Sequence, residues 1–300
     1  MSTASSAGIA AGQAAIRWKE RRAWVRKLPW VSLSVVVVLA MCALFANVIA
    51  PHHPLGQDEA TRVRTQKTLQ APFQSWTNLL GTDRTGRDVL SRLIYGARTS
   101  AVISMIALGT GVLVGTVLGM IAAYRGGWVD TIVMRLADAA LAFPLILVAL
   151  LIVVVLGTGI QNIIIAIAVT VWARFARQVR GEVMTLKERE YVLLARIAGV
   201  SDPVILIRHI FPNVINTLLI VVSLQVGNVI LTEASLSFLG LGLPPGEAAW
   251  GIMVAEGRNF IVSAWWLSLF PGLAITMVVL AFNFFGDWLR DSLDPKLRRI

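Results

Sequence analysis

The sequence predicts an all-α integral membrane protein with six transmembrane helices. Hydrophobic residues make up 56% of the 300 residues and charged residues only 15%, and the mean hydropathy is +0.72. A soluble core of this size cannot hide so much apolar surface. The apolar residues also gather in six runs, most of which approach the ~20 residues that a helix needs to cross a bilayer. The runs cover residues 30–50, 100–124, 136–156, 160–175, 214–231 and 265–285.

The first run follows a basic segment, a combination that is also found in secretory signal peptides. Its apolar stretch is longer than the ~7 to 15 residues of a signal peptide, and Pro51 follows it directly. We therefore interpret this run as a retained membrane anchor. Cys42 within it is the only cysteine of the chain, so no disulfide can form within the chain.

The second run carries a stripe of small residues. Ala107, Gly111, Gly115 and Gly119 recur every four residues. This spacing places them on one helical face, where a neighbouring helix can approach closely. We expect the stripe to be a helix-packing surface.

The third and fourth runs are less regular. Pro144 lies early in the third run, where it removes a backbone donor and predicts a kink. Arg174 interrupts the fourth run early, so the predicted span is short. Tryptophans fall at the ends of many runs, as expected for anchors at the membrane interface. They are Trp24, Trp30, Trp76, Trp128, Trp172, Trp250, Trp265, Trp266 and Trp288.

The basic residues predict the orientation. With six spans both termini lie on one side, and that side holds most of the 27 Lys and Arg residues. Basic residues prefer the cytoplasmic side of a membrane protein. We therefore expect a multi-pass protein of the inner or plasma membrane with both termini in the cytoplasm. The expected division is a cytoplasmic tail (1–28), a first helix with an external loop (29–99), a membrane domain (100–287) and a second cytoplasmic tail (288–300). The loop opposes the trend, because seven of its residues are basic and four are acidic.

A net charge of +10 is also typical of nucleic-acid-binding proteins. The basic residues are, however, dispersed along the edges of the membrane and do not gather in one patch. We therefore expect contact with membrane lipid and none with nucleic acid.

Residues 190–213 (EYVLLARIAGVSDPVILIRHIFPN) form a hydrophilic, charged interruption between the fourth and fifth runs. Tyr191, Leu194 and Ala195 recur at helical spacing, and Gly199 follows where a left-handed C-terminal cap is needed. A short helix is therefore predicted to end at Gly199.

A second short helix is predicted to follow at once. Ser201 and Asp202 are good N-cap residues, and Pro203 suits a first helical position. Pro212 is expected to close this helix. The segment thus predicts two short helices joined by a rigid bend, which we call the elbow (residues 190–213).

The elbow resembles the "EAA" loop of type I ABC-importer permeases, whose pattern is Glu-Ala-Ala, three residues, Gly, nine residues, Ile, one residue and Leu-Pro. Gly199 and Pro212 match at the required separation, and Ala195 matches the second alanine. Several positions depart from the pattern. Leu193 stands where the pattern has Glu, and Leu194 stands where it has the first Ala. His209 replaces the Ile of the pattern, and Phe211 replaces its Leu.

Further segments resemble the C-type permease subunits of dipeptide, oligopeptide, nickel and glutathione importers. Together they extend the resemblance over roughly residues 80–297. They are LGTDRTGRDVLSRLIYGART (80–99), MRLADAALAFP (134–144), ARIAGVSD (195–202), RHIFPN (208–213), EASLSFLGLG (233–242) and LAFNFFGDWLRDSLDPKL (280–297).

This resemblance implies a type I ABC importer permease fold, in which the elbow is a cytoplasmic coupling helix between the fourth and fifth spans. The implied partners are a homologous permease subunit, two ABC ATPase subunits that bind ATP and Mg, and an extracytoplasmic solute-binding protein. The implied ATPase-coupling residues are Glu190, Tyr191, Ala195, Arg196, Gly199, Ser201, Asp202, Arg208, His209 and Pro212.

Other polar residues have two interpretations each. Gln225, Asn228, Glu233 and Ser235 lie along and beyond the fifth run, where they could line a polar pathway or bond to neighbouring helices. In the segment GTDRTGRD we favour a capped turn, with Thr82 or Asp83 starting an interfacial helix, over direct contact with substrate or binding protein. We expect no metal site at His52 and His53, because no further ligand is suitably spaced.

No catalytic residue or cofactor site is expected in this chain. It has no phosphate-binding loop, and its three histidines lie outside the apolar runs. The alternatives to an importer subunit are a secondary transporter, which would have ion-coupling groups at midplane, and a membrane scaffold without transport. The shared motifs do not distinguish which solute is transported: a dipeptide, an oligopeptide, nickel or glutathione.

Overall fold

The structure is a computed structural model that describes residues 29–54, 67–244 and 246–293. Within these ranges the chain is helical, apart from its loops and one isolated bridge between Thr82 and Asp88. The tails predicted over residues 1–28 and 294–300 lie outside the described residues. The helices are α2 (Trp30–Ile49), α3 (Val89–Arg125), α4 (Gly127–Ala142), α5 (Leu145–Leu156), α6 (Ile160–Leu186), α7 (Glu190–Ile197), α8 (Asp202–Val204), the π-helix η1 (Ile205–Ile210), α9 (Phe211–Phe238), α10 (Trp250–Gly257), the 3-10 helix η2 (Arg258–Phe260) and α11 (Trp266–Leu293).

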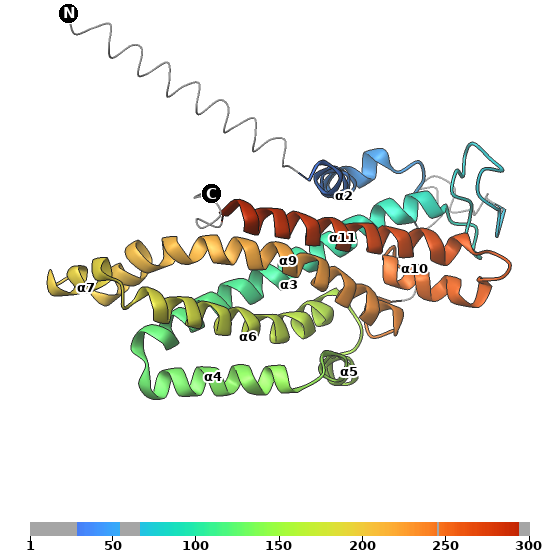
Figure 1. Ribbon diagram of the computed structural model, residues 1–300. Coiled ribbons are helices and arrows are strands. Elements are labelled where there is room, and N and C mark those ends of the chain that lie inside the picture. Colours follow the sequence, from blue (N-terminus) through green and yellow to red (C-terminus); the bar gives the residue numbers. More distant parts are fainter. Residues whose placement is uncertain (1–28, 55–66, 245, 294–300) are drawn as a thin grey trace, which may run out of the picture.

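The long helices α3, α6, α9 and α11 run along one common long axis (Figure 1). The elbow helix α7 lies at one end of this bundle, and α10 lies at the opposite end with the loop that precedes α3. Helix α3 packs against α2, α6 and α9. Its buried residues, such as Ile103, join Phe175 of α6 and Val214 of α9 in one hydrophobic core.

Among the described residues, five helical stretches are long and apolar enough to cross a membrane. They are α2, α3, α6, Asp202–Phe238 and α11. A sixth candidate is the pair α4 and α5, whose axes differ by 88°. The predicted all-α membrane architecture is thus found, with five candidate spans, or six if the bent pair crosses the membrane as one span.

The third span is not one kinked helix over residues 136–156. Helix α4 ends at Ala142, Phe143 and Pro144 have extended backbones with ψ of 132° and 128°, and α5 then leaves in a new direction. Proline disfavours a helical conformation in the residue before it and gives no N–H to the preceding turn. Pro144 therefore separates two helices.

Two helices extend beyond their apolar runs. Helix α6 continues past Phe175 to Leu186, and its polar extension is held by ion pairs from Arg177 to Asp138 and from Arg180 to Asp130. Helix α3 begins eleven residues before Ser100, at Val89, and Asp88 caps it by accepting a hydrogen bond from the Ser91 amide at 2.7 Å. The cap predicted at Thr82 or Asp83 thus lies at Asp88.

Two tryptophans that the sequence placed at the membrane interface are buried instead. Trp250 and Trp266 are only 3% and 5% exposed. Their indole N–H groups donate to the carbonyl oxygens of Leu93 at 2.9 Å and Thr82 at 3.3 Å. A buried indole needs such an acceptor, so Trp250 attaches α10 to α3, and Trp266 attaches α11 to the segment before α3.

Candidate functional site

The first limb of the elbow is α7. It ends in hydrogen bonds from the amides of Gly199 and Val200 to the carbonyl oxygens of Arg196 and Ala195, at 3.0 and 3.1 Å. Gly199 has a φ of +77°, a left-handed conformation that glycine adopts without strain. The predicted glycine cap is confirmed.

The second limb differs from the prediction. Ser201 occupies the N-cap position of α8, but the helix continues through the π-helix η1 into α9, and Pro212 lies in the first turn of α9. Pro212 therefore closes no second short helix. Because it cannot donate to the carbonyl of Arg208, the turn before it widens, and the Phe211 amide bonds to Leu206.

The elbow has a buried face and an exposed apolar face. Val192, Ile205 and Ile210 are fully buried and hold both limbs on the bundle. The opposite face exposes six apolar side chains, with fractions of 39 to 82%. These are Tyr191, Leu193, Leu194, Ile197, Val204 and Ile207.

The other predicted coupling residues surround this apolar face. Ala195 and His209 are half-buried, whereas the rest are exposed. The exposed ones are Glu190, Arg196, Gly199, Ser201, Asp202, Arg208 and Pro212.

Contacts that the sequence did not predict attach the elbow to α3. The Tyr124 hydroxyl donates to Asp202 Oδ1 at 2.7 Å, and the Arg196 guanidinium lies 5.5 Å from the centre of the Tyr124 ring. Lys187, just after α6, donates to the carbonyl oxygen of Ala123 at 3.1 Å. No local pattern marks these pairs, since they join segments that are 64 to 78 residues apart.

The pathway candidates divide between two faces of α9. Asn228 and Ser235 are exposed, Gln225 is half-buried, and Asn228 Nδ2 donates to Gln225 Oε1 at 2.9 Å. Glu233 is fully buried and accepts hydrogen bonds from Ser100 at 2.7 Å and Ser237 at 2.9 Å. Glu233 therefore joins α9 to α3 and presents no surface to a pathway.

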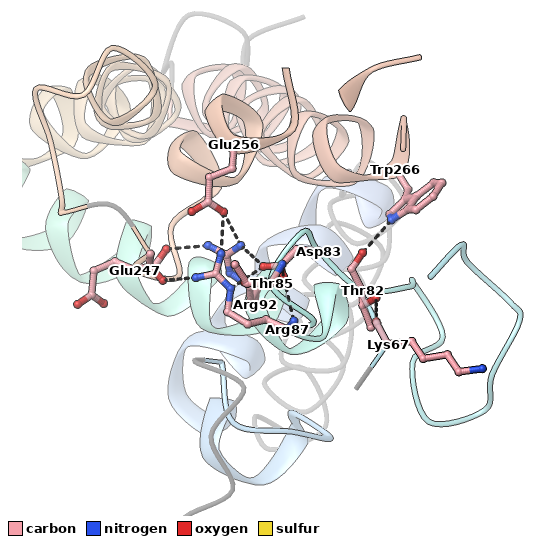
Figure 2. Close-up of polar contacts among 10 residues, drawn as sticks. Lys67, Thr82, Asp83, Thr85, Arg87, Arg92, Glu247, Glu256 and Trp266 are labelled. Carbon is pink, nitrogen blue, oxygen red and sulfur yellow. Dashed lines mark hydrogen bonds and ion pairs between the residues drawn. The ribbon is translucent and has the colours of Figure 1, made fainter. Parts of the chain in front are cut away.

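A buried ionic cluster lies at the end of the bundle that is opposite the elbow (Figure 2). It consists of Asp83, Arg87, Arg92 and Glu256. Each arginine contacts both carboxylates: the distances to Asp83 Oδ2 are 2.5 Å from Arg87 and 2.9 Å from Arg92, and those to Glu256 Oε2 are 3.0 and 2.6 Å. The side chains are only 2 to 16% exposed. The cluster joins the segment before α3 to α10.

Asp83 also organises the turn before α3. Its Oδ1 accepts hydrogen bonds from the amides of Thr85 at 2.8 Å and Arg87 at 2.9 Å. Burial raises the pKa of this carboxyl, but Arg87, Arg92 and these hydrogen bonds outweigh burial and hold the pKa below its ordinary value. Asp83 is therefore ionised at neutral pH.

The arginines of the cluster bind the loop that leads into α10. Arg87 and Arg92 donate to the carbonyl oxygens of Gly246 and Glu247 at 3.0 and 3.1 Å. Two of the basic residues that opposed the predicted orientation are thus ion-paired and buried. The sequence suggested a capped turn here but gave no sign of Glu256, which is 164 residues away from Arg92.

Two of the three histidines, His52 and His53, lie near the start of α3. His52 Nδ1 is 3.8 Å from Asp88 Oδ2, and the ring of His53 lies near that of Tyr95. In the part of the chain that the structure describes, no group of three His, Cys, Asp or Glu residues could hold a metal ion.

The comparisons with known proteins agree with one another. Residues 115–299 match the model of the family described as binding-protein-dependent transport system inner membrane component. A putative peptide transport system permease protein of Brucella suis is 43% identical over 267 residues, which are 89% of this chain and 88% of the relative. A glutathione transport system permease protein of Pectobacterium atrosepticum is 40% identical (88% and 85% covered), and a dipeptide transport system permease protein of Alkalihalophilus pseudofirmus is 39% identical (94% and 90% covered).

Proposed function

The chain belongs to the family of binding-protein-dependent transport system inner membrane components, and from this premise we propose that it forms half of a pathway for di- or oligopeptide import. The observation that carries the proposal is the identity of about 40% to peptide and dipeptide permeases over nearly the whole chain. The glutathione permease among the relatives makes small peptide-like solutes the common chemical class.

We propose further that two cytoplasmic ABC ATPases dock on the elbow and bind the ATP and Mg that drive transport. The elbow presents six exposed apolar side chains, among them Ile197 at 82% and Ile207 at 68%. Exposed apolar side chains that gather on one segment are typical of a binding site, and a short amphipathic helix fits a groove on its partner. A homologous permease and an extracytoplasmic solute-binding protein complete the proposed assembly.

The proposed orientation places both termini and the elbow in the cytoplasm of a cell membrane. The elbow and the extension of α6 carry exposed arginines, as expected for the cytoplasmic side. The ionic cluster then lies outside. Two of its loop's basic residues, Arg87 and Arg92, are paired with Asp83 and Glu256, which supports an external position for that loop.

The proposal is tested by reconstituting the complete assembly in proteoliposomes and measuring uptake of labelled di- and oligopeptides. We expect accumulation that requires ATP, the binding protein and all membrane subunits, and none with a non-hydrolysable ATP analogue. The purified chain alone should neither bind ATP nor accumulate peptide. Uptake by the chain alone under an ion gradient would identify a secondary transporter. Stable assembly without uptake of any peptide would contradict the proposal and favour a scaffold.

A further inference from the structure

Tyr124, in the last turn of α3, contacts both limbs of the elbow. Its hydroxyl bonds to Asp202 at the start of the second limb, and its ring lies under Arg196 of the first limb. Gly199, at the bend of the elbow, lies between these two contacts in the sequence. We propose that Tyr124 is a positioning residue that fixes the elbow relative to α3 and transmits its movement to the transmembrane helices. This inference rests on the proposed docking of ATPases at the elbow.

Packing on Gly199 itself does not set the angle of the bend. Outside its chain neighbours, no atom lies within 4 Å of the position that a Cβ on Gly199 would occupy, whereas Ala195 and Val200 on either side pack against the hydrophobic core. Val192 and Ile205 attach the limbs to the bundle by apolar burial, which has no preferred direction. A hydrogen bond and a cation placed over an aromatic ring are directional. Tyr124 supplies both.

Tyr124 is itself held by a rigid pair of helices. Helices α3 and α6 pack along the glycine stripe, where backbone approaches backbone. At the end of this pair, Lys187 bonds to the carbonyl of Ala123, the residue before Tyr124. A displacement of the elbow by a docked ATPase would therefore pass through Tyr124 to α3 and, because of the close packing, to α6.

Substitution of the hydroxyl separates positioning from folding. Tyr124→Phe keeps the ring under Arg196 and removes the hydrogen bonds of the hydroxyl, to Asp202 and with Arg196. Asp202→Ala removes the bond between Tyr124 and Asp202 from the other side. Tyr95→Phe is the matched control, because Tyr95 lies near the opposite end of α3 and also bonds through its hydroxyl, to Asn47 at 3.0 Å.

The measurement is the number of peptide molecules imported per ATP hydrolysed by the complete assembly in proteoliposomes. We expect Tyr124→Phe and Asp202→Ala to assemble and hydrolyse ATP while this ratio falls roughly 3- to 10-fold, as for the loss of about 1 kcal/mol of coupling. The double variant should be no worse than Tyr124→Phe alone, because the bond that Asp202→Ala removes is already absent there. Tyr95→Phe should import as many peptide molecules per ATP as the wild type.

Three outcomes would overturn the inference. A normal ratio in Tyr124→Phe or, if that variant does not assemble, in Asp202→Ala shows that the bond does not transmit movement. Failure of both variants to assemble shows a purely structural contact. If the wild-type assembly shows no ATP-dependent uptake, both the proposed function and this inference are overturned. If the wild type is active and the variants import as many peptide molecules per ATP as the wild type, only the inference is overturned.

Discussion

Gly199 is required by its backbone conformation and not by lack of space. Its φ of +77° lies in the left-handed region, yet a Cβ would meet no neighbour. That conformation costs a residue with a Cβ roughly 1–2 kcal/mol, while asparagine adopts it more readily. Any substitution at Gly199 therefore acts through the angle of the elbow.

We expect Gly199→Val to disturb the elbow and to leave the bundle intact, because a β-branched residue strongly disfavours the left-handed conformation. The assembled complex should keep its contact with the binding protein but lose solute-stimulated ATP hydrolysis and peptide uptake. Gly199→Asn is the control and should retain most of both. Full uptake by Gly199→Val assemblies would show that the bend plays no part in coupling.

At the scale of elements, α3 and α6 share the most extensive helix–helix contact that the structure describes. A Cβ on Gly111 would lie 2.6 Å from Val171 Cγ1, and one on Gly115 would lie 2.7 Å from Phe175 Cβ and meet the carbonyl oxygen of Trp172. The neighbour of the glycine stripe is thus α6 of the same chain.

Gly115→Leu should therefore destabilise the chain itself by roughly 1–3 kcal/mol, since bulk is forced into a close-packed contact. The check is the thermal unfolding midpoint of the purified chain in detergent. Gly109→Leu is a matched control on the same helix, because no atom lies within 4 Å of its Cβ position, and its midpoint should be unchanged. Equal midpoints for the two variants would contradict the packing argument.

The ionic cluster joins two elements that are distant in sequence, α3 and α10. Replacing one member leaves a buried charge uncompensated, which typically costs about 3–5 kcal/mol. Exposed pairs contribute far less; the Arg177 and Asp138 side chains, for example, are both 54% exposed.

Asp83→Asn should accordingly lower the unfolding midpoint clearly at pH 7, whereas Asp138→Asn should change it little. The pKa of Asp83 is lower in the folded chain than in the unfolded chain, where it is near 4. The ionised carboxylate therefore stabilises the fold fully at pH values above the unfolded-state pKa. This stabilisation is lost as the pH falls through the folded-state pKa. The difference in unfolding midpoint between wild type and Asp83→Asn should therefore become smaller below about pH 4. A difference that stays constant down to pH 3 would exclude this role for the Asp83 charge.

At the scale of the whole molecule, the sequence predicted those features that depend on local chemistry. Apolar runs located the spans, and the left-handed cap at Gly199 followed from residue type alone. Helix ends were misjudged where helices continue beyond their apolar runs, to Val89 of α3 and Leu186 of α6, because hydropathy measures apolarity and not helix length. The Arg92–Glu256 and Tyr124–Asp202 pairs were missed because they bring together distant segments.

The bent pair α4 and α5 decides the topology of the whole chain. If the pair crosses the membrane despite its 88° bend, Gly126 and Gly159 lie on opposite sides and both termini share the cytoplasm. Reporter fusions after Gly126 and Arg189 should then be cytoplasmic, and those after Gly159 and Gly246 external. The basic residues of the elbow favour this arrangement, and the proposed docking of ATPases on the elbow would place the elbow in the cytoplasm. Fusions after Gly126 and Gly159 that report the same side would make the pair a re-entrant loop, leave five spans and place the two termini on opposite sides of the membrane.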